Sequence, residues 1–220
     1  MKLTLFDLDH TLLSGDSDVL WCEFLMQRGV LDRASFEPRN RVMESQYKAG
    51  TVTTQAHSEF YVATLAGRSA LAWQALRLAF LDEVIAPRIP LAAHQLVQQH
   101  QRDGDRVVMT TATNRYITEL TAAHLRIEHL IATECEVAPD GSFSGRVQGT
   151  VNMREGKVQR LHAWLAARGE NLADFETRFY SDSINDLPLL LAVQHAVAVD
   201  PDPQLRAQAQ ARGWAVLSLR

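Results

Sequence analysis

Two carboxylates stand one residue apart near the beginning of the chain, in the stretch Asp7-Leu8-Asp9. They come at the end of an apolar run, residues 3–8, that is typical of a short buried strand. An unpaired carboxylate at the edge of a hydrophobic core is costly unless a metal, a cation or several hydrogen-bond donors compensate it. The rest of the sequence should therefore supply groups that compensate Asp7 and Asp9.

Hydroxyl, ammonium, amide and carboxylate groups recur further along the chain, after predicted strands or near the start of a helix. They are Thr110, Thr111, Lys157, Asp182, Asn185 and Asp186. Carboxylate oxygens suit a hard cation, and Mg²⁺ prefers few carboxylates, its own waters and a substrate phosphate. Asp7, Asp9 and Asp182 are therefore candidate Mg²⁺ ligands, and a threonine hydroxyl and a lysine could hold phosphoryl oxygens.

Each carboxylate in such a set would have a different task. Asp7, held beside a cation and a lysine, would be ionised and positioned as a nucleophile. Asp9, two residues later, would protonate the leaving oxygen and then activate water. This set is sufficient for phosphoryl transfer, in which the protein mainly positions groups and neutralises charge.

The elements that position these groups follow from hydrophobic periodicity. Strands predicted at residues 3–8, 106–111 and 178–183 alternate with helices, and the alternation resumes after residue 88. This pattern predicts an α/β fold, a doubly wound parallel sheet with a Rossmann-like core and right-handed crossovers. Parallel strands bring their carboxyl ends to one crevice. The PDG turn near residue 140 predicts a small β-hairpin in addition.

The segment between the first two strands breaks this alternation. It carries helical patterns only, separated by breaks such as KAGTV and LAGRS, and no convincing strand. The four patterns lie near residues 16–29, 32–49, 54–65 and 69–85. We therefore expect an inserted helical cap at residues 15–87, with the core formed by residues 1–14 and 88–220.

Composition argues against several classes of partner. A formal net charge of −4 and a pI of about 6.1 disfavour nucleic-acid binding by bulk electrostatics. No apolar stretch is long enough for a membrane span, and no basic amphipathic helix suggests a lipid-phosphate substrate. The N-terminus lacks a signal-peptide pattern, and the two cysteines have no disulfide-like spacing. We expect a cytoplasmic monomer or homodimer that acts on a small phosphorylated metabolite.

Four segments resemble, in order, the motifs of the haloacid dehalogenase-like superfamily of phosphohydrolases: DLDHT, VVMTTATN, GKV and YSDSINDLP. The helical insert after the first motif resembles the cap of the phosphoserine-phosphatase-like branch. The resemblance implies Mg²⁺-dependent hydrolysis of a phosphomonoester through an aspartyl-phosphate. Dehalogenases of the superfamily lack the second carboxylate, and a phosphomutase would share these motifs, but the cap type favours hydrolysis.

The resemblance also implies a role for each matching residue. Asp7 corresponds to the nucleophile and Asp9 to the general acid/base, whose backbone carbonyl also binds Mg²⁺. Thr111 matches the second-motif hydroxyl, with Thr110 as the alternative register, and Lys157 matches the third-motif lysine. The remaining matches are Asp182 as a Mg²⁺ ligand, Asp186 and Asn185 as its supporting residues, and the backbone N–H of Leu8 as a phosphoryl-binding group.

Two cap residues bear on the substrate. Phosphoserine phosphatases have a glutamate nine residues after the nucleophile that pairs with the substrate ammonium, and this offset leads to Asp16, which could equally be a helix N-cap. Their carboxylate-clamping arginine aligns, without gaps, near Glu59, which cannot clamp a carboxylate. The whole-chain pattern is similar to members of this branch that are histidinol-phosphatases. Histidinol phosphate is therefore the first candidate and phosphoserine the second. A non-catalytic phospho-ligand-binding module is the alternative from another class, although it would need a damaged motif.

Overall fold

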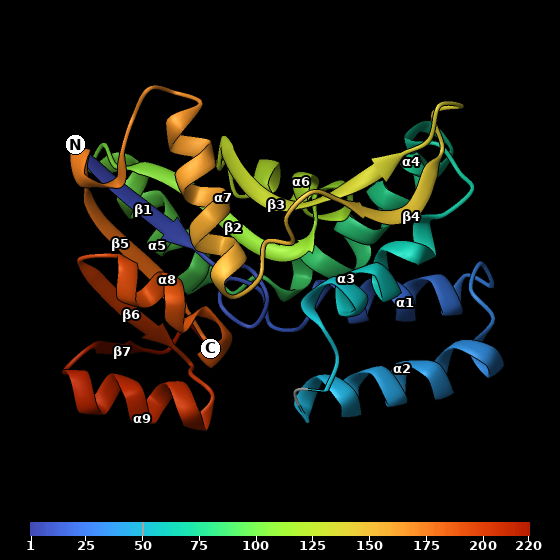
Figure 1. Cartoon of the computed structure of the whole chain (residues 1–220), viewed down its shortest axis with the longest axis horizontal. Coiled ribbons are helices and arrows are strands. Elements are labelled where there is room, and N and C mark those ends of the chain that lie inside the picture. Colours follow the sequence, from blue (N-terminus) through green and yellow to red (C-terminus); the bar gives the residue numbers. More distant parts are fainter. Residues whose placement is uncertain (50) are drawn as a thin grey trace.

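A seven-stranded sheet forms the centre of the protein in this computed structural model, which describes residues 1–49 and 51–220 (Figure 1). Its strand order is β4-β3-β2-β1-β5-β6-β7, and all neighbouring strands are parallel except β3 and β4. The strands are β1 (Lys2–Phe6), β2 (Arg106–Asn114), β3 (His129–Val137), β4 (Phe143–Gln148), β5 (Glu176–Ser181), β6 (His195–Val199) and β7 (Ala215–Leu217). The predicted α/β fold, including the hairpin, is confirmed.

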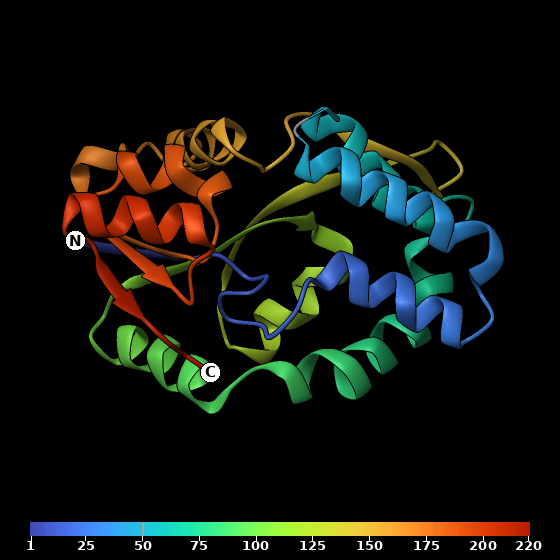
Figure 2. The same cartoon turned by 90° about the horizontal axis from the view of Figure 1, so that it is seen from below.

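Five helices cover the two faces of this sheet (Figure 2). Leu3 and Leu5 of β1 pack in one hydrophobic cluster with α7, α8 and α9, whereas Phe6 belongs to the cluster that contains α5 and α6. This alternation is the period-two pattern of a strand that is buried on both faces. The helices are α5 (Leu91–Arg102), α6 (Arg115–His124), α7 (Glu155–Ala166), α8 (Leu187–Ala192) and α9 (Pro203–Arg212).

The insertion after β1 is helical among its described residues. Its helices are α1 (Ser17–Gln27), α2 (Arg33–Lys48), α3 (Thr54–Val62) and α4 (Ala70–Phe80). Short 3₁₀ and π turns follow in the same segment: η1 (Ala63–Leu65), η2 (Leu81–Ile85) and η3 (Ala86–Arg88). Two further 3₁₀ turns lie in the core, η4 (Leu172–Asp174) before β5 and η5 (Ile184–Asp186) after it. Gly50, in the KAGTV break, lies outside the described residues. No helix in the described ranges is both long and apolar enough to cross a membrane.

The hairpin packs against the cap, which the sequence did not indicate. Phe143 at the start of β4 exchanges backbone hydrogen bonds with the α3–α4 connection, from Gly67 N at 2.9 Å and to Arg68 O at 3.0 Å. Its side chain belongs to the same hydrophobic cluster as Trp21, Trp73 and Phe80 of the cap. The two segments that connect the core to the cap are also hydrogen-bonded to each other, since Ser14 N donates to Arg88 O at 2.9 Å.

Gly156 lets helix α7 begin close to the preceding loop. A Cβ atom at this position would lie 2.0 Å from the carbonyl oxygen of Val151. That oxygen is backbone, so a side chain here would push the start of α7 away from the sheet. The next residue along the helix is Lys157, so this close approach also fixes where the lysine enters the molecule.

We therefore predict that Gly156→Ala lowers the free energy of unfolding by about 1–3 kcal/mol. Urea unfolding followed by circular dichroism measures this loss. Gln159→Ala is the matched control, because residue 159 lies in the same helix and is exposed. A Gly156→Ala protein as stable as the control would contradict the close packing of α7 on this loop.

Candidate active site

Asp7 follows directly after β1, at the carboxyl end of the central strand. Its backbone N–H donates to Tyr180 O at 2.9 Å and so extends the pairing of β1 with β5. Its side chain is 9% exposed. Burial raises the pKa of Asp7 well above its usual value, although the Lys157 ammonium opposes this rise. A carboxylate that is buried here therefore depends on cations for its ionisation.

Lys157, in the first turn of α7, supplies one of those cations. Its Nζ atom donates to Asp7 Oδ1 and to Asp186 Oδ2, each at 2.7 Å. Asp186 Oδ2 also accepts from Ser181 Oγ at 2.7 Å. Burial favours a lower pKa for Lys157, but the carboxylates of Asp186 and Asp7 outweigh burial and hold the pKa above its usual value. The ammonium is therefore charged and fixed between the two carboxylates.

Asp182, just after β5, completes a pair of converging carboxylates. The Thr11 hydroxyl lies 3.3 Å from Asp7 Oδ2 and 3.3 Å from Asp182 Oδ1. Burial and the negative charge of Asp186 raise the pKa of Asp182 to about 7. Lys157 thus leaves part of the negative charge uncompensated. Hard oxygen donors with excess negative charge fit Mg²⁺, which takes few carboxylates and keeps waters.

The Asp9 carboxylate points away from this pair, toward the cap. Its Oδ1 atom accepts from Ser17 N at 2.7 Å, and its Oδ2 atom accepts from Thr113 Oγ1 at 2.9 Å and Thr111 Oγ1 at 3.3 Å. Within residues 1–49 and 51–220, no three Asp, Glu, His or Cys side chains are placed to hold a metal ion. The expectation that the side chain of Asp9 joins Asp7 and Asp182 around one ion is therefore corrected, because local donors engage it. A role for its backbone carbonyl is compatible with this placement.

The two threonine registers point to different surroundings. Thr110 Oγ1 accepts from the buried amide of Asn152 at 3.0 Å, and the same amide also donates to Thr111 O and Ile131 O. Thr111 Oγ1 instead contacts Asp9. Because side chains alternate along β2, only one of the two hydroxyls can face the carboxylates, and this one belongs to Thr111.

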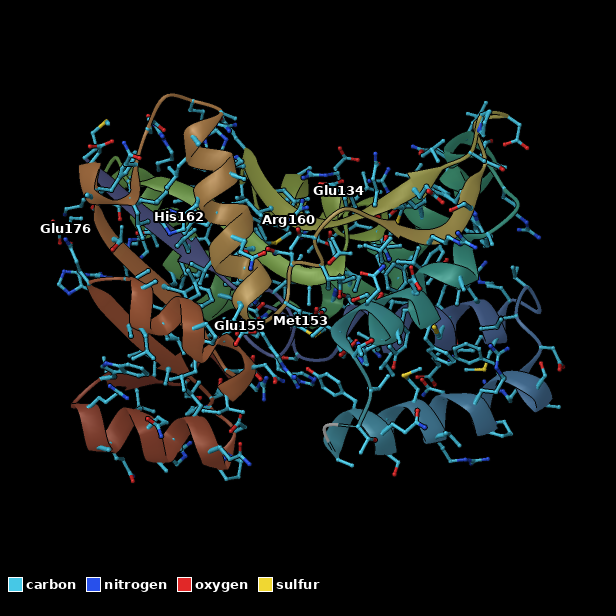
Figure 3. The ribbon with its side chains drawn as sticks, viewed as in Figure 1. Glu134, Met153, Glu155, Arg160, His162 and Glu176 are labelled. Atoms are coloured by element: carbon cyan, nitrogen blue, oxygen red, sulfur yellow. The ribbon has the colours of Figure 1, made fainter. Side chains whose placement is uncertain are left out.

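Asn185 joins the core to the cap. Its Nδ2 atom donates to Tyr47 OH of α2 at 2.7 Å, and its Oδ1 atom accepts from Arg154 Nε at 3.2 Å. Figure 3 shows Met153 and Glu155, on either side of Arg154, near the end of α7 that lies toward the cap. Asn185 is thus positioned between the strand ends and the cap, and among the described residues its side chain forms no hydrogen bond with Asp7 or Asp182.

A cavity of about 580 Å³ lies between these strand ends and the cap. Most of the charged residues in its lining are acidic, and Lys157 is the only lysine or arginine among the described residues that line it. The acidic residues are Asp7, Asp9, Asp16, Asp18, Glu44, Asp182 and Asp186. Since Asp7 and Asp186 already engage Lys157, the carboxyl groups on the cap side of the cavity have no lysine or arginine partner in its described lining, and a cationic group would stabilise their ionised forms.

Asp16 lines this cavity and also caps a helix, so both interpretations of this residue have a structural basis. Its Oδ1 atom accepts from Val19 N at 3.0 Å at the beginning of α1. Burial, and then the negative charge of Asp9, raise the pKa of Asp16 to about 7. Its carboxylate is therefore poorly solvated and lies close to other carboxylates.

Glu59 does not line the cavity, which corrects its predicted place at the substrate end. Its Oε1 atom accepts from Gln55 Nε2 at 2.7 Å on the exposed side of α3. The residues that α3 presents to the cavity are His57, Ser58 and Tyr61. Residue 59 lies between these positions on a different side of the helix, because successive residues rotate by about 100°. The gap-free alignment therefore placed the wrong residue of α3 at this site.

Glu44 and Tyr47 of α2 line the cavity, although the sequence did not single them out. Glu44 and Tyr47 are three residues apart on α2, a spacing that places them on one face. Tyr61 OH donates to Asn40 Oδ1 at 3.1 Å, and Asn40 Nδ2 donates to Glu44 Oε1 at 2.9 Å. The helical spacing was visible in the sequence, but which face meets the core was not.

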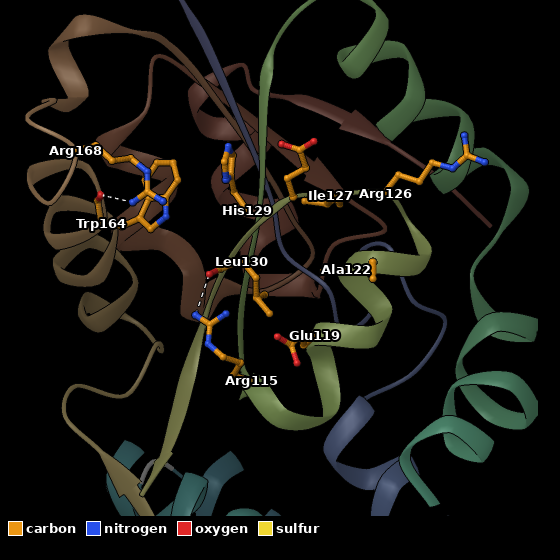
Figure 4. Close-up of a pocket in the computed structure, with 11 residues that line it drawn as sticks. Arg115, Glu119, Ala122, Arg126, Ile127, His129, Leu130, Trp164 and Arg168 are labelled. Carbon is orange, nitrogen blue, oxygen red and sulfur yellow. Dashed lines mark hydrogen bonds between the residues drawn. The ribbon is translucent and has the colours of Figure 1, made fainter. Parts of the chain in front are cut away.

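A larger cavity of about 690 Å³ opens elsewhere, between α6, the beginning of β3 and α7 (Figure 4). Arg115, Glu119, Trp164 and Arg168 line it. It lies at the opposite end of β3 from the hairpin, and none of the residues discussed above as metal or phosphoryl ligands reaches it. Its size therefore does not make it the candidate site, whereas convergent titratable groups mark the smaller cavity.

Comparison with known proteins identifies a family and several similar chains. The family model of haloacid dehalogenase-like hydrolases matches residues 4–191. A histidinol-phosphatase of Neisseria meningitidis serogroup C is 39% identical, over 100% of this chain and 99% of its own. A phosphoserine phosphatase of Mycobacterium tuberculosis is 32% identical, over 98% of this chain and 70% of its own. A crystal structure from Bordetella pertussis, of a protein with unknown function, is 43% identical with a TM-score of 0.95, over 100% of this chain and 99% of its own. A substrate-bound phosphoserine phosphatase shares the fold, at 18% identity and a TM-score of 0.70, over 100% of this chain and 93% of its own.

The raised pKa of Asp16 predicts a pH-dependent effect of Asp16→Asn on stability. The folded protein binds a proton at Asp16 up to about pH 7, whereas a carboxyl of usual pKa 3.8 loses it earlier in the unfolded chain. The charged form therefore destabilises the fold increasingly between about pH 4 and 7. Asparagine keeps the N-cap and removes the charge. Relative to the unsubstituted protein, Asp16→Asn should gain on the order of 1–3 kcal/mol across this range and then level off.

Urea unfolding in EDTA at several pH values measures this difference. Asp32→Asn is the matched control, because Asp32 caps α2 from an exposed position and hydrogen bonds from Ser35 lower its pKa. Relative to the unsubstituted protein, Asp32→Asn should lose a little free energy of unfolding as the pH rises, which is the opposite sign. A pH-independent difference for Asp16→Asn would contradict the proposed burial of its charge.

Proposed function

The chain belongs to the haloacid dehalogenase-like hydrolases and is a phosphoric monoester hydrolase, and from this premise we propose that it is a Mg²⁺-dependent phosphatase that works through an aspartyl-phosphate on Asp7. Asp7 would attack phosphorus, and the P–O bond to the leaving group would break as the new one forms. Lys157 supports this role because its ammonium favours the ionised form of Asp7 and fixes the orientation of that carboxylate. The phosphoryl oxygens would be held by the hydroxyl of Thr111 and the backbone N–H of Leu8.

Asp7, Asp182 and the backbone carbonyl of Asp9 would hold the Mg²⁺ ion. When bound, the ion neutralises the negative charge of the phosphoryl group and of its ligands. Asp186 and Asn185 would act in support, Asp186 through its contact with Lys157 and Asn185 through its link to the cap. The convergence of Asp7 and Asp182 on Thr11 supports this assignment.

Asp9 would act as the general acid and then as the general base. In the first step it gives a proton to the leaving oxygen, and in the second it takes a proton from the water that attacks the aspartyl-phosphate. Both steps require its carboxylate to turn from Ser17 N and Thr113 toward the reacting oxygen. Water that follows the departed alcohol would regenerate Asp7 and release inorganic phosphate.

We further propose a substrate that carries a cationic amine and no carboxylate, with histidinol phosphate as the first candidate. The observation that carries this proposal is the acidic cap side of the cavity, where Asp16, Asp18 and Glu44 meet no free lysine or arginine among the described lining residues. The relative from Neisseria meningitidis named a histidinol-phosphatase supports it. Phosphoserine is the alternative, supported by the relative from Mycobacterium tuberculosis, but its carboxylate would meet like charges. A non-catalytic phospho-ligand-binding module finds no support in the site, since none of the four motifs is damaged.

Asp7→Asn tests the reaction. We expect hydrolysis of p-nitrophenyl phosphate in Mg²⁺ to fall by at least about 10³-fold, because an amide cannot form the phosphoenzyme. EDTA should abolish the activity of the unsubstituted protein, and added Mg²⁺ should restore it. Thermal unfolding of the variant checks that it folds. An Asp7→Asn enzyme that retains its rate would exclude Asp7 as the nucleophile.

Steady-state kinetics tests the substrate class. We expect kcat/KM for histidinol phosphate to exceed that for phosphoserine by at least about tenfold, because a carboxylate facing Asp16 and Glu44 costs binding energy. O-phosphoethanolamine, which has the amine alone, should fall between them or near histidinol phosphate. A clear preference for phosphoserine would overturn this assignment while leaving the phosphatase chemistry intact.

A further inference from the structure

Asp18, in the first turn of α1, has a carboxylate oxygen that the fold leaves without a partner. Its Oδ1 atom is buried and has no hydrogen-bond partner, and the residue lines the cavity. A buried carboxylate oxygen without a donor is costly, and such atoms are rare in folded proteins. Binding of a donor from within the cavity would remove this cost.

The neighbouring Asp16 is less available, although the resemblance points to it. Its Oδ1 atom is engaged by Val19 N as the N-cap of α1. Asp18 lies two residues further along, inside the helix, and its Oδ2 atom accepts a long hydrogen bond from the hydroxyl of Thr113, at 3.4 Å. Among the described residues that line the cavity, the carboxylate oxygen that is buried without a donor is thus Asp18 Oδ1.

Asp18 also lies at the right place relative to the reacting oxygen. The Thr113 hydroxyl bridges it to the general acid, at 2.9 Å from Asp9 Oδ2 and 3.4 Å from Asp18 Oδ2. Asp9 must face the ester oxygen of the substrate. A group on the carbon next to the ester carbon would therefore come close to Asp18, because only one hydroxyl separates the two carboxylates.

We propose that Asp18 is the specificity-determining residue that binds the ammonium group of a substrate in which amine and phosphate ester are on adjacent carbons. This inference rests on the proposed phosphatase function and deepens it. The contact is a charge-assisted hydrogen bond from the ammonium to Asp18 Oδ1. Asp16 and Glu44 add negative potential to the same end of the cavity, but the direct contact belongs to Asp18.

His57 lines the same cavity and offers a second, independent acceptor. Its Nδ1 atom is buried without a hydrogen-bond partner, and its ring stacks on Tyr47 with centroids 4.2 Å apart. Burial lowers the pKa of His57 to about 4, so the ring is neutral near pH 7 and can accept a hydrogen bond. A substrate that carries a second N–H donor beyond its amine, such as an imidazole ring, would reach this atom.

Kinetics of Asp18→Asn with three substrates tests the proposal. The substrates are histidinol phosphate, O-phosphoethanolamine and p-nitrophenyl phosphate, which has no amine. We expect kcat/KM for the two amines to fall by about 10- to 100-fold, mainly through KM, and to fall far less for p-nitrophenyl phosphate. Asp18→Glu, which keeps the charge, should recover part of the loss. Asp82→Asn, an exposed position of the cap, is the matched control and should leave all three rates unchanged.

The same measurement on two further variants locates each contact. Asp16→Asn should affect the amines less than Asp18→Asn does. His57→Phe keeps an aromatic ring and should lower kcat/KM for histidinol phosphate. The ratio of kcat/KM for O-phosphoethanolamine to kcat/KM for p-nitrophenyl phosphate should stay unchanged in this variant.

Several outcomes would overturn the assignment to Asp18. An equal loss for all three substrates would mean that Asp18 only supports Asp9 through Thr113. No loss for the amines would mean that water alone satisfies Asp18 Oδ1, and a larger loss in Asp16→Asn would transfer the role to Asp16. Failure of the proposed function is distinguishable from these results, since the unsubstituted protein would then release no phosphate from any of the three substrates in Mg²⁺.

Discussion

The ammonium of Lys157, held at 2.7 Å from both Asp7 and Asp186, is the interaction on which the site depends. It joins residues that are 150 and 29 positions apart in the sequence, and with them β1, α7 and the segment after β5. Two carboxylates buried side by side would repel each other and favour protonation. Because the lysine is buried with them, removal of any one of the three leaves an uncompensated charge at the edge of the core.

One lysine does not balance the carboxylates around it, and this imbalance links the metal to the substrate. Asp182 keeps a pKa raised to about 7 beside Lys157, and Asp16 has a similarly raised pKa on the cap side. A divalent cation would relieve the first excess of charge, and a cationic leaving group the second. The free protein therefore carries electrostatic strain at both ends of the cavity, and this strain favours ligands of opposite charge.

The core of the site could be predicted from the sequence because strand ends determine it. Asp7 and Asp182 each directly follow a strand of a parallel sheet and Thr111 lies in the last part of β2, so a correct order of strands brings them together. Cap residues depend on helical register and packing instead: the alignment placed Glu59 in the cavity, but α3 turns Tyr61 toward it. The rotamer of Asp9 and the contact of Phe143 with the cap depend on tertiary partners, which local sequence patterns do not reveal.

The position of the cap and the orientation of the general acid are physically linked in this fold. Ser17 N, at the beginning of the first cap helix, donates to Asp9 at 2.7 Å, and Ser17 Oγ donates to Thr113, which holds the other oxygen of Asp9. Any shift of α1 relative to the sheet must therefore change the donors available to Asp9. The same helix carries Asp18. A leaving group that binds Asp18 thus contacts α1, the helix whose first residue, Ser17, donates to Asp9. Recognition of the amine and release of Asp9 for proton transfer therefore both depend on α1.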